Sequence, residues 1–413
     1  TLLALVDPGQ LRGDARLAAD RYLAGRGSVQ AFAAAALSSA DLLVDALLGT
    51  GLREPPRGEF AAAIATLNGS GLPILALDLP SGLDGDSGHA QGTAVRAEAT
   101  VTFVARKLGL YLEEGPDYAG QVYLDDLGVS RPQDGTALPA LELLAKAEIA
   151  RALPPRQHAT HKGDFGRVLI IAGGPGMAGA ARLAGEGALR CGAGLVTVAT
   201  APENVAAIVA GRPELICHAV RGAEDLAPLV AVATVVAIGP GLGTGHWSRV
   251  LLDAVLGVAK PLVIDADAIN LLAATDRNPP PLSVLTPHPG EAARLLETTT
   301  GLIQADRRAA LARLVELTSA VVVLKGAGSL VGAPDRTPAL CANGNAGMAA
   351  PGMGDVLTGA IAAILGQCAD PWRAARAGVL AHALAGDEIA SRGGQRGILA
   401  LDVAAALRRW VNP

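Results

Sequence analysis

The sequence predicts an α/β protein with two three-layer α/β/α domains. Short apolar runs alternate with helical stretches along the whole chain, which is the pattern of parallel sheets with helical crossovers. The runs consist mainly of Leu, Ile, Val and Ala, as expected for buried strands of a parallel sheet. Residues 130–138 (SRPQDGTAL) carry turn formers and little apolar periodicity, and they predict a linker between two blocks.

The first domain is predicted over 1–135 and the second over 145–413. In the first block the apolar runs predict strands at 41–48, 73–79 and 99–104, with helices at 14–24 and 60–67. In the second block they predict strands at 168–172, 195–199, 235–238, 262–264, 283–285 and 320–324, with helices over 178–190 and from about residue 355.

Composition narrows the function to small-molecule chemistry. The net charge is −5, with no dense Lys/Arg cluster, which disfavours a nucleic-acid partner. No apolar run reaches the ~20 residues that cross a bilayer. The four cysteines show no CxxC spacing and fit a reducing compartment. We therefore expect a cytoplasmic protein without a membrane partner.

Four predicted strands of the second block end in Gly, Asp, His or Lys. The segments that follow them are 239–243 (GPGLG), 265–268 (DADA), 286–291 (TPHPGE) and 325–329 (KGAGS). In open parallel sheets, ligands bind beyond the carboxyl ends of the strands. Each segment alone also has a plain structural interpretation. The glycines fit a tight turn, Asp265 or Asp267 fits a helix N-cap, His288 fits a turn between prolines, and Lys325 fits a surface lysine. Together they predict one ligand crevice.

A glycine-rich stretch, 343–359 (NGNAGMAAPGMGDVLTG), leads into a predicted helical run over 356–365. Exposed amides and the positive end of a helix dipole make such a junction an anion site. Asp355 would lie in the first helical turn. There it fits either a general base acting on a substrate hydroxyl or a plain N-cap, and both interpretations stay open.

These segments resemble the ADP-dependent NAD(P)H-hydrate dehydratases, a branch of the ribokinase-like superfamily. The resemblance covers residues ~148–413 and rests also on 161–166 (HKGDFG), 179–198 (GAARLAGEGALRCGAGLVTV) and 265–270 (DADAIN). It implies a ribokinase-like fold and an ADP-driven loss of water from hydrated NADH or NADPH. The products would be NAD(P)H, AMP and phosphate.

The resemblance also implies roles for individual residues. Asp355 would be catalytic and, with Gly241 and His288, would contact the hydrated dinucleotide. The adenine nucleotide, ADP or AMP, would lie on Lys325, Gly326, Ala327, Gly328, Ser329 and Gly354. Mg²⁺ would bridge phosphates, and relatives are usually homo-oligomers.

Three segments of the first block resemble the NAD(P)H-hydrate epimerases, which interconvert the two epimers of the same damaged cofactor. They are 45–51 (DALLGTG), 78–84 (DLPSGLD) and 100–109 (TVTFVARKLG). The resemblance implies that Asp78 is a catalytic, substrate-contacting carboxylate and that Asp45 and Ser81 bind K⁺. The implied substrate loop comprises Gly49, Thr50, Gly51, Leu52, Arg53, Glu54 and Pro55.

The family's first βαβ unit, with its Asn-Asn-Gly-Gly-Asp loop and a further K⁺ ligand, would precede Thr1. We therefore expect an incomplete Rossmann-like domain with little epimerase activity, whether as a fragment or as a degenerate scaffold. For the second block two alternatives remain. One is a vitamin or sugar kinase of the same superfamily, and the other is a non-catalytic nucleotide-binding module, against which the retention of both Lys325 and Asp355 argues.

Overall fold

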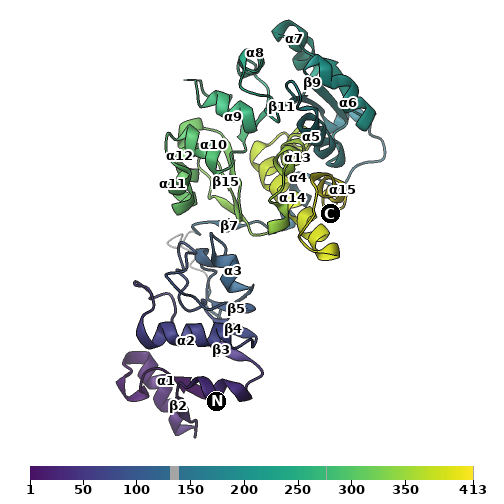
Figure 1. The fold of residues 1–413 in the computed structure, drawn as a ribbon. Helices are drawn as coiled ribbons and strands as arrows, with labels where there is room; N and C mark the ends of the chain where they lie inside the picture. Colours follow the sequence, from purple (N-terminus) through teal and green to yellow (C-terminus); the bar gives the residue numbers. More distant parts are fainter. Residues whose placement is uncertain (131–138, 276, 413) are drawn as a thin grey trace. The chain divides into compact units, whose positions relative to one another are not determined.

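The computed structural model describes residues 1–130, 139–275 and 277–412. The chain forms two compact units, Thr1–Leu138 and Pro139–Pro413 (Figure 1). The predicted linker lies outside the described residues except for Ser130, and the predicted domain bounds of 1–135 and 145–413 stay predictions. No helix in the described part of the chain is long and apolar enough to span a membrane.

A parallel four-stranded sheet is the frame of the first unit. Its strand order is β3 (Leu43–Asp45), β4 (Ile74–Leu77), β5 (Ala99–Phe103) and β6 (Gln121–Asp125). The first three fall inside the predicted strands, whereas β6 has no predicted counterpart. The other elements are the parallel pair β1 (Leu2–Ala4) and β2 (Val29–Ala31), and the helices α1 (Gly13–Ala24), α2 (Gly58–Gly69) and α3 (Gly115–Ala119).

A mostly parallel ten-stranded sheet is the frame of the second unit. Its order is β10 (Ile216–Ala219), β9 (Leu195–Thr200), β8 (Arg167–Ile171), β11 (Val235–Ile238), β12 (Leu262–Ile264), β13 (Ser283–Leu285), β14 (Val321–Leu324), β15 (Ser329–Gly332), β16 (Ala339–Cys341) and β7 (Glu142–Leu143). Only β15 runs antiparallel to its neighbours. The predicted α/β class with parallel sheets is therefore confirmed.

Helices alternate with these strands. They are α4 (Ala147–Ala152), α5 (Ala178–Arg190), α6 (Val205–Gly211), α7 (Ala223–Val232), α8 (His246–Leu256), α9 (Ala266–Leu272), α10 (Pro289–Leu295), α11 (Thr300–Ala305), α12 (Arg307–Thr318), α13 (Met353–Cys368), α14 (Pro371–Gly393) and α15 (Ala400–Trp410). Short 3-10 helices are η1 (Pro8–Gln10), η2 (Ala34–Ser39), η3 (Leu108–Leu110), η4 (Lys162–Phe165), η5 (Pro202–Asn204) and η6 (Ala346–Met348).

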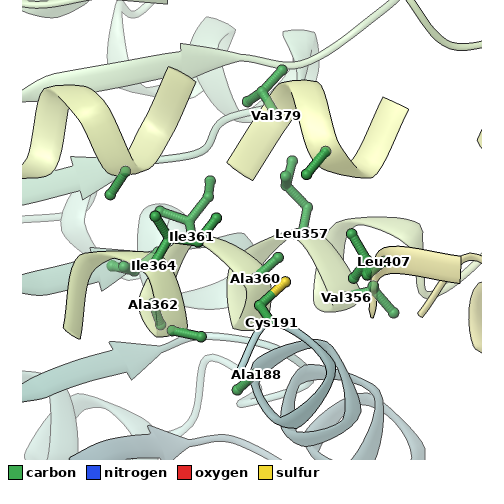
Figure 2. Close-up of a cluster of buried hydrophobic side chains, with 14 of the residues drawn as sticks. Ala188, Cys191, Val356, Leu357, Ala360, Ile361, Ala362, Ile364, Val379 and Leu407 are labelled. Atoms are coloured by element: carbon green, nitrogen blue, oxygen red, sulfur yellow. The ribbon is translucent and has the colours of Figure 1, made fainter. Parts of the chain in front are cut away.

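Helix α13 lies in the core of the second unit. Figure 2 shows its apolar side chains, Ile361 among them, between Cys191 at the end of α5 and Val379 of α14. Glycines bring α5 and α13 into backbone contact. A side-chain carbon at Gly187 would lie 2.3 Å from a carbonyl oxygen of α13, and one at Gly359 would lie 1.9 Å from a carbonyl oxygen of α5. Close packing therefore fixes where the first turn of α13 begins.

Candidate active sites

The four segments predicted to form a crevice leave neighbouring strands at one edge of the sheet. Strands β11, β12, β13 and β14 are adjacent and parallel, so their carboxyl ends meet. Lys325 Nζ lies 2.6 Å from Asp265 Oδ1 and 3.8 Å from Glu291 Oε2, which joins three segments. A side-chain carbon at Gly239 would lie 1.8 Å from the Asp265 carbonyl oxygen. The fold thus brings all four segments together.

The buried Asp265 carboxylate lies at the centre of this cluster and binds three other side chains. It is 1% exposed, and its Oδ1 accepts hydrogen bonds from the Thr286 hydroxyl at 2.8 Å and from Lys325 Nζ. Its Oδ2 accepts a hydrogen bond from the Thr358 hydroxyl of α13 at 2.7 Å. Although Asp265 occupies the N-cap position of α9, its side chain makes no capping hydrogen bond there. Asp265 therefore has the predicted N-cap position, but its side chain binds the cluster instead of the helix end.

The glycine-rich loop opens α13 beside Lys325. Gly352 is the N-cap residue and adopts a left-handed φ of 85°, which glycine tolerates without strain. A side-chain carbon at Gly354 would lie 3.5 Å from Lys325 Nζ and 3.8 Å from Asp265 Oδ2. Because Gly354 has no side chain, the first-turn amides and the helix dipole lie next to a lysine. These are the components of an anion site.

Asp355 lies in the first turn of α13, and Gly352 rather than Asp355 is the N-cap residue. Burial raises the pKa of Asp355 to about 7, the charges of Asp265 and Asp267 act in the same direction, and Lys325 opposes them. A general base is most effective when its pKa lies near the working pH. The environment of Asp355 therefore suits a base better than a cap.

Lys325 is a partly buried cation held by two carboxylates. Burial acts to lower the pKa of Lys325, but the charge of Asp265 and then that of Glu291 raise it overall. His382 of α14 is buried nearby, and burial lowers the pKa of this imidazole to about 4. At neutral pH, Lys325 is therefore charged and His382 is neutral.

The loop from Lys325 to Ser329 is fastened by Arg307, a residue that we did not predict. Arg307 is 4% exposed and donates from Nη1 to the Ala327 carbonyl at 2.5 Å and from Nη2 to the Leu324 carbonyl at 3.3 Å. The Ser329 hydroxyl donates to the Gly326 carbonyl at 3.0 Å. In the sequence Arg307 resembles any exposed helix arginine, and nothing in its neighbours signals burial.

Asp387 of α14 holds the start of the glycine-rich loop, and it is a second residue that sequence reasoning missed. Its carboxylate accepts hydrogen bonds from the Gly344 amide at 3.0 Å and from the Asn345 side chain at 3.0 Å. Asn345 in turn caps η6 through the Gly347 amide. The loop is thus attached to α14 about forty residues further along the chain, a spacing that no local pattern predicts.

His288 and Gly241 have local structural roles. The Nδ1 of His288 caps α10 by accepting hydrogen bonds from the Gly290 and Glu291 amides, and its Nε2 lies 3.2 Å from Glu291 Oε1. The Gly241 carbonyl accepts a hydrogen bond from the Gly174 amide at 2.7 Å, so this loop meets the loop after β8. The side chain of His288 is half-exposed, and Glu291 connects it to the cluster through Lys325.

In the first unit, Asp78 pairs with a lysine that we did not predict as a site residue. Asp78 Oδ1 accepts hydrogen bonds from Lys107 Nζ, from the Phe103 amide at 3.1 Å and from the Thr102 hydroxyl at 3.2 Å. Burial acts to raise the pKa of Asp78, but these hydrogen bonds, that of Lys107 first, hold it below its usual value. Asp78 has a left-handed φ of 69°, which is strained for a residue with a side chain.

Asp45 and Ser81 also meet, at the ends of β3 and β4. Asp45 is 1% exposed and accepts hydrogen bonds from the Ser81 amide at 2.8 Å and the Ser81 hydroxyl at 2.6 Å. The Leu48 carbonyl lies 3.2 Å from the same hydroxyl. Burial raises the pKa of Asp45. A buried carboxylate and the further oxygen atoms around it can serve as ligands of a hard cation, and the cation would offset the cost of burying the charge.

The predicted substrate loop, 49–55, runs along the surface between β3 and α2. Its residues are exposed except for the half-buried Leu52. A side-chain carbon at Gly85 would lie 4.0 Å from the Thr50 methyl and 3.9 Å from the Lys107 stem. The loop and the Lys107–Asp78 pair therefore border the same space.

Comparisons with known proteins agree with this arrangement. Residues 168–409 match the family model for NAD(P)H-hydrate dehydratase, and residues 1–109 match that for the YjeF-related protein N-terminus. The bifunctional NAD(P)H-hydrate repair enzyme Nnr of Coxiella burnetii is 45% identical over 98% of this chain and 83% of its own. That of Escherichia coli is 44% identical over 100% of this chain and 80% of its own.

A solved structure resembles the second unit. It is the ADP/ATP-dependent NAD(P)H-hydrate dehydratase of Bacillus subtilis, co-crystallised with ATP and Mg²⁺, with 30% identity and a TM-score of 0.60 over 65% of this chain and 97% of that one. The family resemblance seen in the sequence is thereby confirmed for both units. This chain belongs to the family of bifunctional NAD(P)H-hydrate repair enzymes.

Proposed function

We propose that the second unit dehydrates hydrated NADH and NADPH at the expense of ADP. The observation that carries the proposal is the position of Asp355, a half-buried carboxylate in the first turn of α13, next to Lys325 and the open amides at Gly354. This arrangement places a base beside an anion site, as transfer of a phosphoryl group to a hydroxyl requires.

The chemistry runs in two steps. Asp355 accepts the proton of the ring hydroxyl while that oxygen attacks the terminal phosphorus of ADP. A new O–P bond forms, the bond to the bridging oxygen breaks, and AMP leaves. The hydroxyl is now a phosphate ester, which is a far better leaving group. Its C–O bond then breaks, the neighbouring ring carbon loses a proton, and NAD(P)H and phosphate are released.

The nucleotide would lie on the loop that Arg307 fastens. In this proposal Lys325, the loop amides at 326–329 and Gly354 bind phosphate, while Gly241 and His288 border the hydrated dinucleotide. Within residues 1–130, 139–275 and 277–412, no group of three or more His, Cys, Asp or Glu side chains could hold a metal ion. Mg²⁺ usually takes only one or two carboxylates plus phosphate oxygens, so an ion that arrives on the nucleotide fits this site.

The test is recovery of absorbance at 340 nm from purified hydrated NADPH. We expect recovery that requires a nucleotide diphosphate or triphosphate and that releases phosphate in equal amount. Comparison of ADP with ATP identifies the preferred donor. A stable phosphorylated product without recovered absorbance would instead make the second unit a kinase, and nucleotide binding without turnover would make it a binding module.

For the first unit we propose the epimerase chemistry of its family, at the low rate expected from the sequence, with Asp78 and Lys107 at the substrate and the loop 49–55 covering it. The Asp45 carboxylate, the Ser81 hydroxyl and the Leu48 carbonyl would hold K⁺, which would offset the cost of burying the Asp45 charge. The test is the rate of exchange between the two epimers in KCl and in a tetramethylammonium salt. Equal rates in both salts would remove K⁺ from the proposal.

We also propose that the protein works as a homo-oligomer in the cytoplasm with small molecules as its only ligands. All four cysteines are free thiols, as a reducing compartment allows, and the net charge of −5 gives no electrostatic support for nucleic-acid binding. Light scattering after size exclusion gives the oligomeric state, and a single-chain mass would contradict the first part of this proposal.

A further inference from the structure

We propose that Asp265 is a positioning residue for the phosphate site, holding Lys325 and the first turns of α13 in fixed places relative to each other. The inference rests on the proposed dehydratase function. It concerns a residue that makes no direct step in that chemistry, because its two carboxylate oxygens are already occupied by three donors.

The three donors come from the elements that surround the site. Thr286 follows β13, Lys325 follows β14 and Thr358 belongs to α13, while Asp265 itself follows β12. Both threonines are fully buried. One buried carboxylate therefore connects three strand ends to the catalytic helix, and such charge-assisted hydrogen bonds are stronger than neutral ones.

Lys325 needs such a partner because its ammonium group sits on a long stem with many rotamers. Asp265 lies 2.6 Å from its Nζ, whereas Glu291 lies at 3.8 Å, a longer and weaker contact. Asp265 thus selects the rotamer that places the ammonium group beside Gly354.

On the other side, the Thr358 hydroxyl fixes α13. Thr358 is three residues after Asp355, so the two side chains lie on the same face of the helix. The hydrogen bond from Thr358 to Asp265 therefore sets the rotation of the helix about its axis at the point where Asp355 must meet the substrate. Because a misplacement of about 1 Å can cost ~10²-fold in rate, this bond has catalytic consequences.

Asp265 also sets part of the field at Asp355. The charged groups that act on Asp355 are Asp265, Asp267 at the start of α9 and Lys325 after β14, whereas His382 of α14 is neutral. Removal of the Asp265 charge removes one of the influences that raise the pKa of Asp355. A variant at Asp265 should therefore shift the pH profile, which a purely structural role would not do.

The experiment compares Asp265→Asn with Thr358→Val in the full chain. Asp265→Asn removes the charge, whereas Thr358→Val removes one hydrogen bond to the same carboxylate and keeps the charge. For Asp265→Asn we expect a KM for ADP raised roughly tenfold, as for loss of one charged hydrogen bond, and an acidic limb of kcat moved to lower pH. For Thr358→Val we expect a lower kcat with the acidic limb unmoved.

Each outcome decides the inference. Unmoved pH limbs and an unchanged KM for ADP in Asp265→Asn would overturn it. If that variant does not fold, Thr286→Val replaces it: a raised KM for ADP supports the inference and an unchanged KM overturns it. If the wild-type protein does not recover NADPH, the proposed function fails. The inference is then decided by calorimetric Kd values for ADP: a weaker Kd in Asp265→Asn supports it, and equal values in wild type and variant overturn it.

Discussion

The two units each place an aspartate near a lysine, but the lysine has a different partner in each. In the first unit, Lys107 donates directly to Asp78, and the pKa of Asp78 is held below its usual value. In the second, Lys325 donates to Asp265 instead, and the pKa of the neighbouring Asp355 is raised to about 7. Burial acts to raise the pKa of both carboxylates. It prevails at Asp355, whereas the hydrogen bonds from Lys107, Phe103 and Thr102 prevail at Asp78.

This difference separates two kinds of chemistry. A carboxylate paired with a lysine stays ionised over the physiological range, but it is a weak base because its charge is already compensated. Asp355 is half-buried beside a lysine that binds another carboxylate, and its pKa near neutrality suits the acceptance of a substrate proton. In the proposed mechanism Asp265 would hold Lys325 beside the phosphate, while the effect of Lys325 on Asp355 is too small to overcome that of burial.

The most severe test is Asp355→Asn. Loss of the base should lower dehydratase kcat by ~10²–10⁴-fold, the usual contribution of general-base catalysis. The KM for ADP should change little, because Lys325 and the loop amides remain. Recovery of NADPH absorbance gives the rate and calorimetry gives ADP binding, with Asp225→Asn, an exposed carboxylate in the first turn of α7, as the matched control. A variant that kept full turnover would remove Asp355 from the mechanism.

Lys325→Met should have the next largest effect. The substitution keeps the length of the side chain but removes the cation beside Gly354, so the KM for ADP should rise by ~10–100-fold, the cost of a lost charge-assisted contact. The pKa of Asp355 should also rise, because Lys325 opposes its other neighbours. Steady-state kinetics at pH 7 and pH 9 measure both changes. An unaltered KM would place the phosphate elsewhere.

The pH profile of the wild-type protein compares the two units directly. Because the base must be deprotonated, a pKa of about 7 for Asp355 predicts that dehydratase kcat falls as pH drops, by roughly tenfold between pH 8 and pH 6. Asp78, with a lowered pKa, should remain ionised over this range. Carbon-13 titration of the aspartate carboxyls distinguishes the two groups. A flat dehydratase profile between pH 6 and pH 8 would contradict the assigned base.

Much of this arrangement could be predicted because it depends on patterns within short stretches of the sequence. Strands β8, β11, β12 and β13 are buried apolar runs, and each appears within one residue of its predicted range. The glycine-rich junction at Gly352 likewise predicted a helix start next to an anion site. The edge strand β10 and the hairpin of β15 and β16 were missed. Strand β10 alternates exposed and half-buried residues, and β15 contains Ser329 and Gly332, so neither is a continuous apolar run.

The partners of the charged residues could not be predicted. Lys325 and Asp265 are sixty residues apart, and their contact follows from the strand order β12-β13-β14, which periodicity does not give. The pair of Asp78 and Lys107 and the contact of Arg307 with Ala327 likewise depend on tertiary packing. The sequence could therefore name the candidate base but not the environment that raises its pKa.

The smallest expected effects, on stability, have opposite signs in the two units. A raised pKa means that folding favours the protonated form of Asp355, so stability falls as pH rises from about 4 to about 7. Asp355→Asn should remove this cost and raise the Tm of the second unit by a few degrees at pH 8, with no gain below pH 4.

Lys107→Met should lower the Tm of the first unit at pH 7, because Asp78 loses the partner that favours its ionised form, and the loss should disappear once acid protonates Asp78. Calorimetry across this pH range measures the Tm of both variants. If both Tm values changed in the same direction at pH 8, the assigned difference between Asp355 and Asp78 would be wrong.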